Sequence, residues 1–134
     1  MIMNMNTYAQ QYQRNKILTA SPAELTLMLY EGGIKFTNMA IHAVEEKDYE
    51  SANANIKKVE RVIGEFKVTL DHKYEVAKDF DRIYDYLLER LLDASISKDK
   101  VILEEIAEHL RSMRDNWKEV MKAAAAGNSQ MKQA

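Results

Sequence analysis

Residues able to perform chemistry are few in this chain, and their spacing does not assemble a catalytic or metal site. The three histidines, His42, His72 and His109, lie far apart, and the sequence contains no cysteine. A di-metal site in a helical protein would need Glu-x-x-His pairs on two helices, whereas Glu105 and His109 stand four residues apart. Adjacent carboxylates such as Glu104 and Glu105 would point about 100° apart on a helix, which does not suit paired acid–base work. We therefore expect no enzyme activity, no metal and no cofactor.

The composition also argues against several classes of partner. The formal net charge of the 134 residues is −2, and the basic residues Lys57, Lys58 and Arg61 alternate with Glu60 and Glu65. Such a mixed surface does not favour nucleic acid. No stretch approaches the roughly 20 apolar residues that a membrane-spanning helix needs, and a chain without cysteine fits a reducing compartment. We expect one cytoplasmic domain that neither binds nucleic acid nor inserts into a membrane.

Caps and apolar spacing predict four helices in the chain. The first begins at Ser21, because a proline follows this residue and Glu24 stands where a capping box places an acidic side chain. Asp48 can cap the second helix, and Ser97 or Asp99 can cap the fourth. The predicted helices span residues at about 21–45, 48–71, 75–95 and 98–125.

The apolar stripes of these helices predict how they pack. Residues such as Ile56 and Ile63 in the second helix, and Leu103 and Leu110 in the fourth, recur in steps of three and four. Four glycines and one proline are too few for a fold rich in turns and sheets. The predicted fold is therefore all-α, an antiparallel four-helix bundle with a short N-terminal arm. Residues 1–20 would form the arm, residues 21–126 the bundle and residues 127–134 a flexible tail.

The first predicted helix has more apolar residues than one core-facing stripe requires. Leu25, Met28, Phe36 and Ala43 form the stripe that we assign to the core, and a second apolar set falls roughly opposite it on a helical wheel. This set could be ordinary exposed surface that neighbouring helices partly cover. The alternative, which we prefer, is a groove for an apolar peptide. The residues expected to bind that peptide are Leu27, Tyr30, Ile34 and Ile41.

The segment before Ser21 is too short for a stable independent helix and too apolar for a plain disordered tail. It contains Tyr8, Tyr12 and Ile17. We expect these three side chains to lie on the groove and to cover it when the partner is absent. The alternative is a fixed structural strap that never leaves the bundle.

Three stretches of the chain, taken together and in order, resemble the flagellin export chaperones of the FliS family. After Tyr8, residues 19–32 carry a Ser-Pro-x-x-Leu-x-x-Met-Leu-Tyr-Glu-Gly pattern that is similar to the N-terminal signature of that family. Residues 84–94 read Tyr-Asp-Tyr-Leu-Leu-x-Arg-Leu-Leu-x-Ala and resemble its third helix. Residues 103–119, from Leu-Glu-Glu-Ile to Trp-Lys-Glu, resemble its last helix. We add Tyr86, in the second stretch, to the expected client-binding residues.

The resemblance implies a function that composition and spacing do not reach. A member of this family would hold the disordered C-terminal segment of flagellin in the cytosol, prevent its premature polymerisation and deliver it to the flagellar type III export gate. The client would wrap the bundle and displace the N-terminal arm. We expect a monomer or a weak dimer. The alternative is a helical binding module that serves another secretion or signalling client.

Overall fold

The computed structural model describes residues 5–133, which contain five helices and no strand. This result confirms the predicted all-helical class. Residues 1–4 of the expected arm and residue 134 of the expected tail lie outside the described part of the chain. The helices are α1 (Met5–Thr19), α2 (Pro22–Glu45), α3 (Tyr49–Thr69), α4 (Ala77–Ser97) and α5 (Lys100–Gln133).

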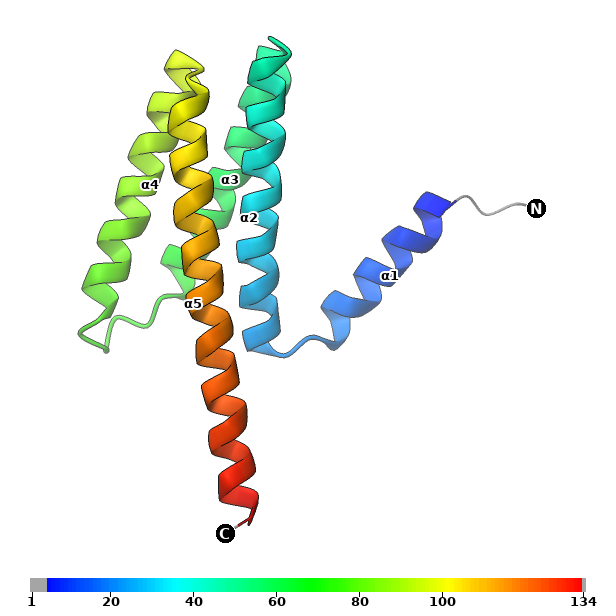
Figure 1. Ribbon diagram of the computed structural model, residues 1–134, viewed down its shortest axis with the longest axis vertical. Helices are drawn as coiled ribbons and strands as arrows, with labels where there is room; N and C mark the ends of the chain where they lie inside the picture. Colours follow the sequence, from blue (N-terminus) through cyan, green and yellow to red (C-terminus); the bar gives the residue numbers. More distant parts are fainter. Residues whose placement is uncertain (1–4, 134) are drawn as a thin grey trace.

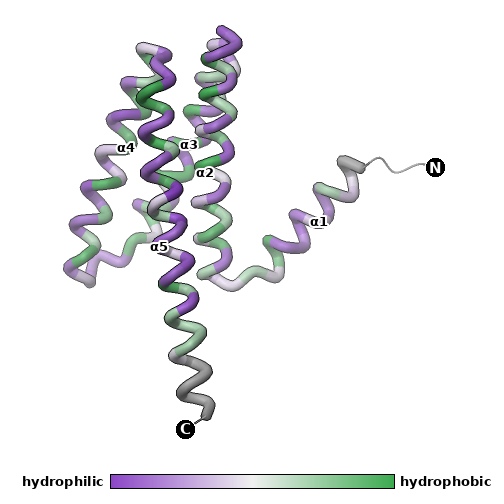
Figure 2. The backbone as a smooth tube through the Cα atoms, in the orientation of Figure 1, coloured by the Kyte–Doolittle hydropathy of each residue, from purple (hydrophilic) through white to green (hydrophobic). Residues whose placement is uncertain are grey.

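Helices α2 to α5 pack together as a helical bundle, and α1 projects away from it (Figure 1). Helix α2 contacts both α3 and α5, and α4 contacts both α3 and α5. Figure 2 shows hydrophobic and hydrophilic residues alternating along the four packed helices, as expected of helices with one buried side. The packed helices α2 to α5 therefore fix the positions of the side chains on the surface of the bundle.

The centre of the bundle consists of aliphatic side chains from α3, α4 and α5. The inward-facing positions near the middle of these helices are buried, whereas five residues that the apolar spacing also places inward are exposed, namely Tyr49, Val76, Phe80, Ile83 and Val120. Tyr49, Val76 and Phe80 lie in the first turn of a helix or just before it, where a side chain has fewer neighbours to pack against. The largest fully buried aliphatic side chains of the three helices are Ile56, Val59, Ile63, Leu87, Leu91, Leu103, Ile106 and Leu110.

The predicted faces of α2 are wrong. Tyr30 and Ile34, which we assigned to an outer stripe, are only 6% and 8% exposed, whereas Leu25, which we assigned to the core, is 38% exposed. The physical reason is that the buried stripe of α2 contains small residues, which carry little hydrophobic signal in the sequence. Its buried members, in steps of one or three residues, are Tyr30, Gly33, Ile34, Thr37, Ala40 and Ala43.

Two of these small residues allow close packing at the centre of α2. A Cβ atom on Gly33 would lie 3.4 Å from Leu110 Cδ1 and 3.4 Å from Val62 Cγ1, so α5 and α3 both approach the helix closely at this point. The Thr37 hydroxyl is fully buried, and it donates a hydrogen bond to the Gly33 carbonyl at 2.7 Å. Because this hydroxyl is satisfied within the helix, its burial carries little cost.

The predicted caps of the first two bundle helices are confirmed. Ser21 Oγ accepts a hydrogen bond from the Glu24 backbone N–H at 3.2 Å and lies 3.1 Å from Glu24 Oε1. Asp48 Oδ1 accepts a hydrogen bond from the Ser51 N–H at 3.2 Å. Of the two candidates for the last helix, Asp99 is the residue that accepts a hydrogen bond from the first turn of α5, from the Val101 N–H at 2.9 Å.

Ser21→Ala is expected to lower the free energy of unfolding by about 1 kcal/mol, because it leaves the Glu24 N–H without its capping partner. Chemical denaturation followed by circular dichroism measures this change. Thr19→Ala is the matched control, since the Thr19 hydroxyl donates to a carbonyl at the end of α1 and takes no part in the start of α2. A loss of partner binding at unchanged stability would contradict a purely structural role for Ser21.

The last helix is longer than predicted. Helix α5 continues to Gln133, well beyond residue 125, so residues 127–133 are helical rather than the flexible tail that we expected. Gly127 does not end the helix, because a single interior glycine costs only about 1 kcal/mol and the preceding alanines are strong helix formers. Figure 1 shows this part of α5 extending past the ends of its neighbours.

Candidate functional site

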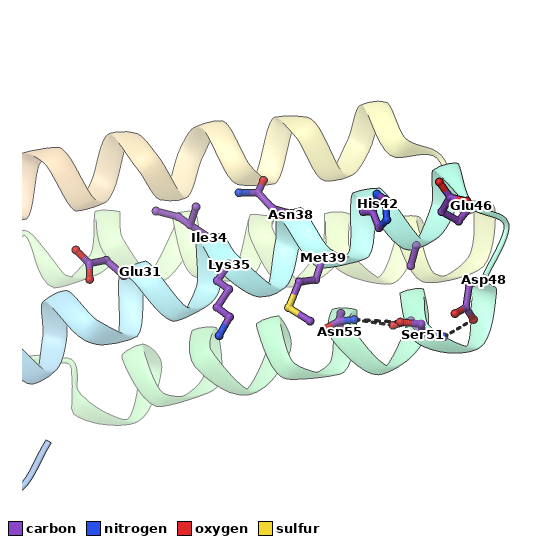
Figure 3. Close-up of a pocket in the computed structure, with 11 residues that line it drawn as sticks. Glu31, Ile34, Lys35, Asn38, Met39, His42, Glu46, Asp48, Ser51 and Asn55 are labelled. Atoms are coloured by element: carbon purple, nitrogen blue, oxygen red, sulfur yellow. Dashed lines mark hydrogen bonds between the residues drawn. The ribbon is translucent and has the colours of Figure 1, made fainter. Parts of the chain in front are cut away.

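A groove between α2 and α3 is the candidate functional site (Figure 3), and we call it the α2/α3 groove. Its volume is about 730 Å³. Its position follows from the packing of α2, whose buried stripe turns toward α3 and α5 and leaves the neighbouring face partly open. The lining residues from α2 and its C-terminal turn are Glu31, Ile34, Lys35, Asn38, Met39, His42, Ala43 and Glu46, and those from Asp48 onward are Asp48, Ser51 and Asn55.

The groove combines apolar side chains with a polar rim. Ile34 and Ala43 are buried, and Met39 is the exposed apolar side chain between them. Both signs of charge occur on the rim, with Glu31 and Lys35 one turn apart on α2. An apolar strip between charged edges is the surface that a helical or extended amphipathic peptide fits. The flexible thioether of Met39 adapts to differently shaped apolar side chains.

A second groove lies where α1 meets α2. Its volume is about 720 Å³, and Gln13, Lys16 and Ile17 of α1 form one of its sides. Leu25, Met28 and Phe36, which we assigned to the core, line this groove, and Phe36 also packs against the core. Helix α2 therefore does present two sets of apolar residues, as the sequence indicated, but Tyr30 and Ile34 of the predicted outer set are the buried ones.

The arm does not cover the α2/α3 groove. Tyr8, Tyr12 and Ile17 are exposed, and none of them lines this groove. Helix α1 points away from the bundle (Figure 1), so the covering of a groove by the arm stays a prediction. At about 100° per residue, Ile17 falls on the opposite side of a helix from Tyr8, so α1 as a helix presents these two side chains on different faces.

Deletion of residues 1–16 is expected to leave the melting temperature of the protein unchanged, because the exposed α1 adds little buried apolar area to the bundle. Differential scanning calorimetry of the full and shortened chains measures this. A lower melting temperature would instead indicate the fixed strap that the sequence left as an alternative. Tighter partner binding after deletion would show that the arm competes with the partner for the groove, as expected if the arm covers the groove when the partner is absent.

The remaining residues predicted to bind the client lie apart from one another. Leu27 and Ile41 are half-buried and line neither groove. Tyr86 is exposed on α4, where its hydroxyl bonds to the Glu105 carboxylate of α5 and its ring lies edge-on to His109 with centroids 5.9 Å apart. The structure therefore does not bring Tyr86 to the α2/α3 groove.

The contacts of Tyr86 indicate a structural role in joining α4 to α5. The hydrogen bond between the two side chains raises the pKa of the Tyr86 hydroxyl and lowers the pKa of the Glu105 carboxyl. Arg90 Nη2 also contacts Glu105, at 3.2 Å from Oε2, and Arg90 Nη1 contacts Asp93 at 3.1 Å. A binding role for Tyr86 stays a prediction.

Asn55 was not among the residues predicted to bind the client, although it is the most deeply buried polar side chain of the groove. Asn55 is 4% exposed. It occupies a position on the apolar stripe of α3, three residues after Ala52 and four before Val59. A polar residue inside an apolar stripe was the signal that could have identified it, because buried polar groups are uncommon without a partner or a function.

Two other features of the described residues bear on function. Among the side chains that the structure describes, those of residues 7–127, no group of three or more potential metal ligands is placed to hold an ion. In the same part of the chain, no helix is both long and apolar enough to span a membrane.

Comparison with known proteins identifies the family. Residues 4–124 match the family model described as flagellar protein FliS. The chain is 38% identical over 112 residues to the flagellar secretion chaperone FliS of Bacillus subtilis, with 84% of each chain covered. It is 29% identical over 115 residues to the flagellar secretion chaperone FliSB of Pseudomonas aeruginosa, covering 84% of this chain and 91% of that one. It is 27% identical over 124 residues to the FliS chaperone of Salmonella typhimurium, covering 90% and 92%. The chain described above therefore belongs to the FliS family of flagellar secretion chaperones.

Proposed function

We propose that this protein is an export chaperone for flagellin, which binds the disordered C-terminal region of flagellin in the cytoplasm. In this role it prevents premature polymerisation and delivers the subunit to the flagellar type III export gate. The observation that carries the proposal is the α2/α3 groove, an open apolar strip with an exposed Met39, in a chain of the FliS family. No catalytic step is part of the function.

The arrangement of the helices supports a long and shallow contact with the client. A disordered segment pays conformational entropy when it becomes ordered, so it must bury a large surface to bind firmly. We infer that α2 to α5 act as an antiparallel four-helix bundle whose length provides this surface, and that α1 is an arm able to change position. The free protein would be a monomer or a weak dimer.

The second candidate is a helical binding module for another secretion or signalling client. It has the same groove and differs only in the partner. Pull-down from the cytosol of the source bacterium discriminates the two, because a flagellin chaperone captures flagellin as its main apolar partner.

The direct test is calorimetric titration of the full chain with the C-terminal segment of flagellin from the same bacterium. We expect a 1:1 complex with a negative heat-capacity change, which is the signature of apolar burial. The N-terminal segment of the same flagellin is the control and is expected to bind much more weakly. Absence of binding to the C-terminal segment would refute the proposed function.

A further inference from the structure

The amide of Asn55 is held in one orientation. Its Nδ2 donates a hydrogen bond to the Ser51 carbonyl at 2.9 Å and lies 3.5 Å from the Ser51 hydroxyl. A flipped amide would place two acceptor oxygens, Asn55 Oδ1 and the Ser51 carbonyl, against each other. The hydrogen bonds therefore fix Oδ1 on the side of the amide that faces away from Ser51.

In that orientation, Asn55 Oδ1 is a buried acceptor without a hydrogen-bond partner among the side chains of residues 7–127 and the backbone that the structure describes. Nearly all buried side-chain acceptors in folded proteins are satisfied, and an unsatisfied one destabilises the fold. A function would explain the asparagine at this position if a binding partner brings a hydrogen-bond donor to Asn55 Oδ1.

The position of Asn55 indicates where such a donor would come from. Asn55 lines the α2/α3 groove, and Figure 3 shows Met39 reaching from α2 toward it. Met39 is 44% exposed and has three rotatable side-chain bonds, so a partner can displace it. A segment bound in the groove would then bring a donor to Oδ1.

We propose that Asn55 Oδ1 accepts a hydrogen bond from a free backbone N–H in the first turn of a helix formed by the bound client. The inference rests on the proposed function and deepens it, since it specifies which part of a client the groove receives. The first four N–H groups of a helix have no partner within the helix, and asparagine is among the best side chains for capping them. Asn55 would thus cap a client helix across the interface.

The charged side chains on the rim of the groove also favour binding of the N-terminal end of a client helix. Glu31, Glu46 and Asp48 contribute carboxylates to the lining, against one lysine, Lys35. The N-terminus of a helix carries partial positive charge, which nearby carboxylates stabilise. Burial of the apolar residues of the client against Ile34 and Met39 would supply most of the affinity, and Asn55 would set the register.

Asn55→Ala in the full chain is expected to weaken binding of the flagellin C-terminal segment about tenfold, because one client N–H loses its acceptor in a desolvated groove. The melting temperature of the free protein is expected to stay unchanged, because the substitution removes an unsatisfied acceptor and introduces a strong helix former. Asn53→Ala is the matched control: Asn53 lies two residues away on α3 and does not line the groove. It should leave the affinity unchanged.

A second measurement identifies the hydrogen bond itself and does not depend on the stability of any variant. Hydrogen exchange of a ¹⁵N-labelled client segment, bound to the unaltered chaperone, should show one strongly protected amide at the start of a bound helix. Replacing that amide by an ester should weaken binding to the unaltered chaperone about tenfold and have no further effect on Asn55→Ala.

The outcomes separate this inference from the proposed function. If the unaltered chain binds the segment but Asn55→Ala binds it equally well, Asn55 is satisfied by water alone and the inference is wrong. If the unaltered chain does not bind the segment at all, the proposed function fails and the inference fails with it.

Discussion

Replacement of Met39 by aspartate is expected to weaken binding of the flagellin C-terminal segment about a hundredfold, because a bound client would strip water from the introduced carboxylate without supplying a partner charge. Three acidic residues, Glu31, Glu46 and Asp48, already line the same groove and would add like-charge repulsion. The free protein should stay folded, since Met39 is a partly exposed side chain. Calorimetric titration and thermal unfolding measure the two effects on one sample.

Val68→Asp is the control for the Met39 substitution. Val68 is an apolar residue of α3 that is 81% exposed and does not line the α2/α3 groove. It therefore tests whether any new carboxylate on the surface reduces binding through net charge. If Val68→Asp and Met39→Asp reduce the affinity equally, the groove is not the binding site.

Unlike Met39→Asp, which should leave the free protein folded, Ile34→Asp is expected to lower the free energy of unfolding by about 3 kcal/mol or more. The reason is that it places a carboxyl group in the core. Ile34 belongs to the buried cluster that α2 shares with α3, α4 and α5. Chemical denaturation measures the loss, and Ile34→Val is the matched control, with an expected cost of about 1 kcal/mol.

The destabilisation by Ile34→Asp should depend on pH with a defined sign. Burial raises the pKa of the introduced carboxyl in the folded state above its unfolded value of about 3.9. The penalty is therefore largest near neutral pH, falls as the pH is lowered, and is smallest below about 3.9, where the carboxyl becomes protonated in both states. A variant as stable as the original at pH 7 would show that Ile34 lies on an open surface, as its place in the predicted outer stripe implied.

The sequence by itself determined the helical class, the starts of α2 and α3, and the central core that α3, α4 and α5 supply, but not the helix α1 in the segment before Ser21. Capping depends on side chains within one turn of the chain, so Ser21 and Asp48 could be assigned from their neighbours. Residues such as Ile63, Leu87 and Leu110 lie on helices with a single apolar stripe, and such a stripe has only one way to face the core. The family resemblance likewise depended on motifs that can be read along the chain.

Only the tertiary structure decided which face of α2 is buried, where the arm lies and which residues meet in the groove. Helix α2 packs against two neighbours, and its buried stripe includes Gly33, Thr37 and Ala40, whose burial comes from close helix approach rather than from hydrophobicity. Met39 is exposed because α3 and α5 pack against the buried stripe of α2, and Met39 lies outside that stripe. Asn55 lines the groove because α3 lies beside α2 in the fold, and a contact between separate helices is not encoded in the periodicity of either one.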